Sequence, residues 1–241
     1  MAETLKGHPF GDAAASCPQT LKLGAVYPDV LFYLTGSLDT ARYREIAQAY
    51  HGVQGEDTYA LIRRTATSLT GSPYPEPLRA FLAGVACHVQ TDMTFHPFVY
   101  HMTGNYDDAD PARRSRSIKD NRRLECLLDL YFCEGSKNFG AYSLTDILIH
   151  LELPLIDLLE FLASSGADIS EYPAMIPVTT QALRNFRILQ RLFKRRGLTR
   201  FLDMITPCLP AMAQETATLF YSPALDIHLS RLNGKLPYQN P

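Results

Sequence analysis

The sequence predicts an all-α fold. Its apolar residues recur mainly at intervals of three and four, the spacing that gathers them on one face of a helix. No series of segments alternates apolar and polar residues between hairpin turns, as strands of an exposed sheet would. With 241 residues, 46% of them hydrophobic, the chain can bury one sizeable core. We therefore expect a single helical domain over residues 1–241, with candidate functional motifs in 1–135 and a helical remainder in 143–241.

Turn-forming residues separate the apolar-periodic stretches. Breaks at Gly71-Ser72-Pro73, Gly104-Asn105 and Gly135-Ser136 divide the first half of the chain, and Gly166 and Pro173 interrupt the second. In chain order, the stretches between them predict helices over residues 39–50, 56–70, 76–95, 116–133, 143–164, 178–196, 198–205 and 209–221.

Composition excludes some classes of protein. Lysine and arginine number 23 against 25 for aspartate and glutamate, so there is no specific signal for nucleic-acid binding. The five cysteines are odd in number and form no C-x-x-C pair, which is typical of reduced thiols. The chain shows no signal peptide and no run of about 18 apolar residues, so we expect a cytoplasmic protein without a transmembrane segment. The sequence leaves the oligomeric state open.

A basic segment, ADPARRSRSIKDNRRLECLL, precedes an apolar helical face. It holds five arginines and a lysine within about a dozen positions. Two interpretations stay open: a solvated helix start, or a rim that attracts phosphate.

The stretch HVQTDMTFHP at residues 88–97 carries possible metal ligands. On a helix, residues at i, i+4 and i+8 drift only about 40° per step around the axis, so His88, Asp92 and His96 share a face. Pro97 should end the helix near His96 and leave its imidazole at an accessible rim. Imidazole and carboxylate are ligands that zinc accepts. The alternative is a buried pair of His88 and Asp92 that only stabilises the helix.

Further candidate ligands lie elsewhere. Glu125 is in an apolar-periodic helix, where a lone buried carboxylate is costly unless it is paired or bound to a metal. His51 follows a predicted helix, Asp29 stands between apolar runs, and His8 is flanked by breakers.

The order of these segments resembles the bacterial zinc-dependent phospholipase C family, whose superfamily also includes single-strand nucleases. The matching segments are HPFG (8–11), GAVYPD (24–29), YHG (50–52), GVACHVQTDMTFHPFVYHMTG (84–104) and NRRLECLLD (121–129). The resemblance implies an all-α domain with up to three zinc ions between its helices.

The same resemblance implies a ligand set. It places Asp29, His51, His88 and Asp92 around one zinc, with Asp92 able to bridge to a second ion bound by His8. His96 and Glu125 would belong to a third site, together with residue 121. There the family has a histidine and this chain has Asn121, whose amide oxygen is a poorer zinc ligand.

These residues predict a zinc-dependent phosphodiester hydrolase similar to phospholipase C, with one to three zinc ions. Its substrate would be a phosphodiester, with a phospholipid among the candidates, and zinc would activate the attacking water. Asp29 would orient or deprotonate that water, or serve only as a ligand. The alternative is a non-catalytic helical protein that retains one structural zinc and binds a partner, which Asn121 favours.

Overall fold

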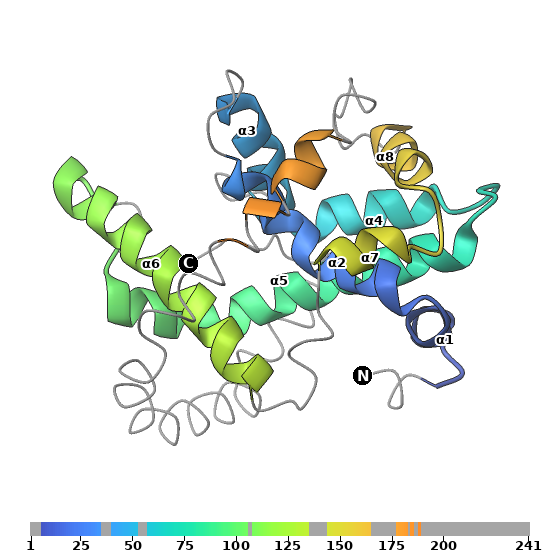
Figure 1. The fold of residues 1–241 in the computed structure, drawn as a ribbon, viewed down its shortest axis with the longest axis horizontal. Coiled ribbons are helices and arrows are strands. Elements are labelled where there is room, and N and C mark those ends of the chain that lie inside the picture. The colour runs from blue at the N-terminus through green and yellow to red at the C-terminus, as the bar shows by residue number, and fades with distance from the viewer. Residues whose placement is uncertain are drawn as a thin grey trace. The chain divides into compact units, whose positions relative to one another are not determined.

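The computed structural model describes residues 6–34, 40–52, 57–105, 108–134, 144–164, 177–182, 184–185 and 188. Every regular element in these ranges is helical, which confirms the all-α prediction. The helices are α1 (Pro9–Ser16), α2 (Pro18–Val30), the short 3₁₀ helix η1 (Leu31–Tyr33), α3 (Thr40–His51), α4 (Tyr59–Thr67), α5 (Pro75–Thr103), α6 (Pro111–Glu134), α7 (Leu144–Ile149) and α8 (Leu155–Ser164) (Figure 1). None of them is both long and apolar enough to cross a membrane.

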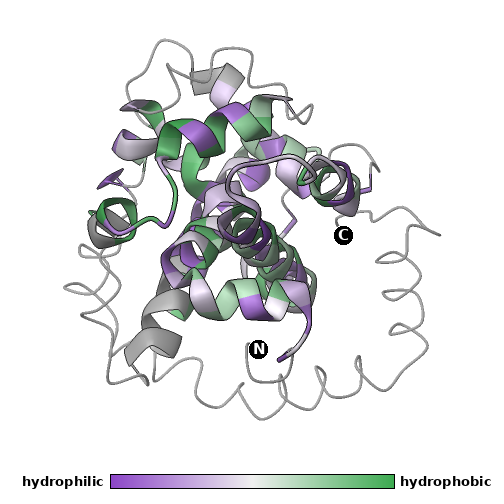
Figure 2. Cartoon of the chain, turned by 90° about the vertical axis from the view of Figure 1, so that its right-hand side faces the viewer, coloured by the Kyte–Doolittle hydropathy of each residue, from purple (hydrophilic) through white to green (hydrophobic). Residues whose placement is uncertain are grey.

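The described residues divide into two compact units. The first takes the residues up to 91 and those from 144 to 185, and the second takes those from 92 to 134 together with residue 188. In the first unit, α2 packs against α3 and α7. Its core is apolar, with Tyr27, Phe81 and Leu158 fully buried. Hydrophobic and hydrophilic residues alternate along single helices (Figure 2), as expected for helices that bury one face.

Two glycines let the backbones of α2 and α5 approach each other closely. A Cβ atom added to Gly24 would collide with the carbonyl oxygen of Phe81, and one added to Gly84 would collide with that of Leu21. These obstacles are backbone atoms, which cannot rotate aside as a side chain can. The contact therefore fixes α5 against α2 just before His88.

The N-terminus of α2 is capped by a residue far along the chain. Cys17 precedes α2 and makes no capping hydrogen bond with its side chain. Instead, the Glu152 carboxylate accepts hydrogen bonds from the backbone N–H groups of Gln19 (3.0 Å) and Thr20 (2.8 Å) and from the Thr20 hydroxyl (2.6 Å). Partial burial raises the pKa of this carboxyl, but these hydrogen bonds outweigh burial and lower the pKa below its ordinary value.

The second unit contains the end of α5 and α6. The buried face of α6 includes Ser117, Asn121, Leu124 and Leu128. Gly104 ends α5 with a φ of +93°, and a Cβ atom there would lie 2.7 Å from the Ser117 hydroxyl. Glycine is favoured at this position for its backbone conformation, and a larger residue would also have to displace the Ser117 hydroxyl.

The structure confirms helices at 39–50, 56–70 and 116–133, with ends shifted by a few residues. It also reveals α1 and α2, which the sequence prediction missed. Each of these two helices begins with a proline, a residue suited to the first helical position because its missing N–H would have no intrahelical partner there.

Two predicted helices need correction. The helix predicted over 76–95 does not end near His96, because α5 continues through Pro97 to Thr103. Proline removes a single backbone hydrogen bond, and burial of Met93 and Val99 on either side holds the helix together. The helix predicted over 143–164 is two helices, α7 and α8, separated by the segment that carries Glu152.

The remaining predicted elements lie largely or wholly beyond the described residues. Residues 177–182 are helical and overlap the start of the helix predicted over 178–196. The helices predicted over 198–205 and 209–221 lie outside the described residues.

Gly84→Ala should destabilise the first unit. The added methyl group would force α5 away from α2, and overpacking of this kind typically costs about 1 to 3 kcal/mol. Ala83→Ser, which adds one heavy atom at the neighbouring half-buried position, is the control. Denaturant unfolding with both variants measures the difference. Equal stability of the two variants would contradict a tight α2–α5 contact.

Glu152→Gln should destabilise the protein at neutral pH by about 1 kcal/mol, the usual contribution of a helix cap. Because the folded-state pKa is lowered, the ionised carboxyl stabilises the fold above its ordinary pKa of 4.5, and that contribution is lost as the pH falls through the folded-state value. The stability difference between wild type and variant should therefore shrink below about pH 4.5.

Unfolding free energies measured across pH 3 to 7 test this expectation. Glu160→Gln, at an exposed glutamate on α8, is the matched control and should show no such pH-dependent difference. A difference for Glu152→Gln that is constant with pH would contradict the capping role.

Candidate metal centre

His88 is held by α2, although it belongs to α5. Its Nδ1 lies 3.0 Å from the carbonyl oxygen of Ala25, and its side chain is 9% exposed. A carbonyl oxygen can only accept, so Nδ1 carries the proton. In the neutral ring, Nε2 then presents its lone pair on the opposite side, which is the form that binds a metal.

His51 is oriented in the same way by its own helix. It is the last residue of α3, and its Nδ1 lies 2.9 Å from the carbonyl oxygen of Ala47, one turn earlier. The His51 carbonyl oxygen accepts a hydrogen bond of 2.9 Å from the Thr58 hydroxyl, which ties the end of α3 to the start of α4. Because the Ala47 carbonyl can only accept, Nδ1 of His51 carries the proton in the neutral ring and Nε2 does not.

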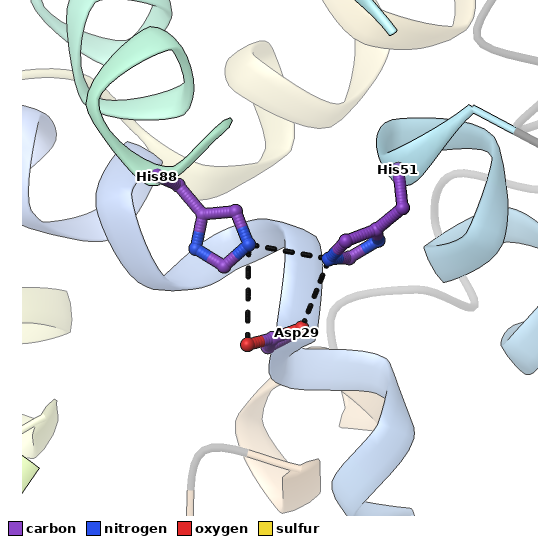
Figure 3. Close-up of side chains that lie close together, drawn as sticks. All are labelled: Asp29, His51 and His88. Carbon is purple, nitrogen blue, oxygen red and sulfur yellow. Dashed lines mark hydrogen bonds and ion pairs between the residues drawn. The ribbon is translucent and has the colours of Figure 1, made fainter. Parts of the chain in front are cut away.

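Asp29 lies near the end of α2 and faces both imidazoles (Figure 3). Its Oδ1 is 3.1 Å from Nε2 of His51, and its Oδ2 is 3.9 Å from Nε2 of His88. The aspartate side chain is 40% exposed, whereas that of His51 is 14% exposed. The three-residue group is thus exposed to solvent at the Asp29 carboxylate and largely buried at the two histidines.

The three residues have the spacing of metal ligands. The two Nε2 atoms are 3.2 Å apart, and two nitrogens bound to one tetrahedral zinc at about 2.0–2.1 Å would lie about 3.3 Å apart. One ligand atom from each of the three residues lies within 4.8 Å of the others. With both rings neutral, two nitrogen lone pairs face each other beside a carboxylate, and this set of donors fits a divalent metal ion.

The second unit holds another set of predicted ligands. Nε2 of His96 lies 3.7 Å from Oδ1 of Asp92 and 3.6 Å from Oε1 of Glu125. His96 is 12% exposed and lies inside α5, so it is not at the accessible helix end that was predicted. Asn121 is one turn before Glu125 on α6 and is 2% exposed, and its Nδ2 has no hydrogen-bond partner among the described residues.

Two predicted roles remain untested by this geometry. His8 is exposed and caps α1, where its Nδ1 accepts a hydrogen bond of 3.3 Å from the Phe10 N–H. The group formed by Asp29, His51 and His88 does not include it. Asp92 belongs to the second unit, so its predicted place at the same ion as His88 stays a prediction.

Sequence reasoning missed the groups that orient the histidines. The Ala47 carbonyl could have been inferred, because a histidine at a helix C-terminus can reach the carbonyl one turn back. No pattern in the sequence pointed to Ala25, whose role depends on how closely α2 and α5 approach. Tyr27 and Tyr50, which the sequence analysis did not single out, pack edge to face with ring centroids 5.5 Å apart.

Comparison with known proteins agrees with the predicted family. Residues 13–163 match the family model described as zinc-dependent phospholipase C. The match includes the three residues of the candidate centre and the four of the second unit, and it begins after His8. No curated protein and no solved structure matched the chain. Since the matched segment covers more than half of the 241 residues, the chain belongs to the zinc-dependent phospholipase C family.

Proposed function

We propose that this protein is a zinc-dependent phosphodiester hydrolase in which Asp29, His51 and His88 bind the first zinc ion. The observation that carries the proposal is the convergence of two imidazole nitrogens and a carboxylate from three helices, with both rings turned by carbonyl acceptors. Structural zinc sites usually have four protein ligands, whereas catalytic sites keep a position open. Among the described residues the candidate group has three ligands, and its 40% exposed carboxylate would leave a coordination position accessible, which favours a catalytic site.

Asp29 has the position of a group that acts on water. Bound zinc would supply an acidified water and neutralise charge on the phosphate. Asp29 would hold the attacking water through Oδ2, which lies 3.9 Å from the nearer histidine nitrogen, and take up its proton, while Oδ1 stays directed at His51. A role as ligand alone is the alternative for this residue. The two histidines fix the site and exclude solvent from its inner side.

The second unit supports a proposal for a further ion. Asp92, His96, Glu125 and Asn121 would offer two carboxylates, one imidazole and one amide oxygen. Such an oxygen-rich set suits a harder ion such as Mn²⁺ or Mg²⁺ better than the imidazole-rich set of the family does. His8 stays a proposed ligand of an additional ion on the basis of the family resemblance. Its position at the start of α1 does not add to this argument.

The family implies a substrate with a phosphodiester bond, and a phospholipid is the substrate class in the family's description. The competing function is a non-catalytic protein with one structural zinc. Asn121 favours this alternative, because it removes an imidazole from the second set of ligands. Metal content separates the two, since a hydrolase should hold zinc at a site with an open coordination position.

His88→Ala should lower zinc affinity more than the roughly 10- to 100-fold typical of losing an outer-shell partner, because it removes a direct ligand. Hydrolysis should fall in step with zinc occupancy. The measurements are metal analysis of the purified protein and assays with bis(p-nitrophenyl) phosphate, phosphatidylcholine and single-stranded DNA. His101→Ala, at an exposed histidine on the same helix, is the control. Wild-type protein that holds zinc but cleaves no phosphodiester would favour the structural alternative.

Asn121→His should increase the zinc content by about one ion per chain. The new imidazole would stand one turn from Glu125 on α6, and residues at i and i+4 face the same way. Ser115→His, on an exposed part of the same helix, is the control for the added histidine. Hydrolysis should rise only if the added ion binds the transition state better than the substrate. If wild type already holds as many zinc ions as the Asn121→His variant, then Asn121 does not weaken zinc binding by the second set of ligands, and the proposal for that set is contradicted.

A further inference from the structure

Two stretches of the chain concentrate positive charge. Residues 184–200 carry seven cationic side chains and no carboxylate, and most of them lie outside the described residues. The other stretch is on α6. Residues 111–124 contain six cationic side chains and one carboxylate, Asp120, which gives a net charge of +5 in a chain whose total is −2. The catalytic proposal uses none of these cations. Their position on α6 therefore needs a separate explanation.

The arrangement on the helix distinguishes three of them. Arg116, Lys119 and Arg123 are exposed, and at 100° per residue they fall within about 60° of one another around the helix axis. The first and last of them are seven positions apart, or about 10 Å along the helix. The buried face, centred on Asn121 and Leu124, lies roughly on the opposite side. We call these three residues the basic stripe.

The basic stripe is not neutralised by its neighbours. Arg113 pairs with Asp108 and Asp110, and Arg114 donates to the Asp108 carbonyl. By contrast, no ion pair involves a residue of the basic stripe in the described part of the chain, although Asp120 is one turn after Arg116. Arg113 and Arg114 thus bind residues that precede α6, whereas the basic stripe is exposed to solvent.

We propose that the basic stripe on α6 binds the anionic surface of a lipid bilayer. This inference rests on the proposed function in one respect, because a phospholipid substrate would be met at such a surface. Each lysine or arginine near an anionic membrane contributes about 1 kcal/mol, or about fivefold in binding. Three such residues on one line give an attraction that is weak, additive and sensitive to salt.

Single-stranded nucleic acid fits the stripe less well. Proteins that bind it combine cations with aromatic side chains on which the bases stack. Residues 108–125 contain no aromatic residue. A bilayer surface requires only charge, which is what the stripe provides.

The test measures binding of zinc-loaded protein to vesicles. Wild type should bind vesicles containing phosphatidylglycerol and not vesicles of phosphatidylcholine alone, and binding should weaken as ionic strength rises. The triple variant Arg116→Glu, Lys119→Glu, Arg123→Glu should lose at least about tenfold in partitioning. The control Lys6→Glu, Arg44→Glu, Arg64→Glu makes the same charge change at exposed cations of the first unit and should bind like wild type.

A second variant, in which the three charges are neutralised rather than reversed, covers the case of misfolding. If the triple glutamate variant fails to fold by circular dichroism, the triple glutamine variant of the same residues should show a smaller loss in the same direction. Equal binding of the stripe and control variants would overturn the proposal, as would no preference of wild type for anionic vesicles. Tighter binding to a single-stranded oligonucleotide than to the vesicles would also overturn it.

The assay separates this inference from the proposed function. Cleavage of soluble bis(p-nitrophenyl) phosphate should be the same in wild type and in the stripe variant, because the stripe is not part of the proposed site. If the protein cleaves this compound but does not bind anionic vesicles, the basic stripe proposal fails alone. If it binds the vesicles through the stripe but cleaves no phosphodiester, the proposed function fails and the membrane-binding surface stands.

Discussion

The close approach of α2 and α5 is the constraint on which the candidate centre depends. Gly24 and Gly84 have no Cβ atom, so the two backbones can lie in contact. That contact brings the His88 ring within hydrogen-bond distance of the Ala25 carbonyl. Ala25 is one turn before Asp29 on α2, so the same contact that turns the imidazole also sets its distance from the carboxylate. The packing of α2 against α5 therefore also determines the geometry of these metal ligands.

His51 reaches the site by a different route, and this difference matters for stability. Its ring is held by its own helix, and α3 ends at that residue. Bringing its Nε2 to 3.2 Å from that of His88 is unfavourable for two neutral rings with facing lone pairs. A bound cation converts this repulsion into shared coordination. The end of α3 should consequently be more firmly held in the metal-loaded protein than without metal, since binding energy at such a site also contributes to folding.

The sequence predicted the all-α class and the shared helix of His88, Asp92 and His96, because helical periodicity is a local property. It could not predict the end of α5 correctly, since burial of Met93 and Val99 outweighs the single hydrogen bond lost at Pro97. The sequence singled out Asp29 and His51 as candidate ligands, but only the order of motifs assigned them to the same ion as His88. Their distances depend on helix packing between residues far apart in the chain, as does the role of Glu152, which caps a helix more than 130 positions earlier.

The charge on α6 differs in kind from a general excess of positive charge. A protein that is basic overall is attracted to an anionic surface in many orientations, whereas this chain has a net charge of −2 and must carry excess negative charge outside residues 111–124. Attraction would act through the exposed cations of α6, whereas the acidic residues elsewhere in the chain would be repelled by the same surface. Because exposed charges are screened over about 8–10 Å at physiological salt, only the residues nearest the surface would contribute. Local concentration of charge thus gives a weak contact a defined direction.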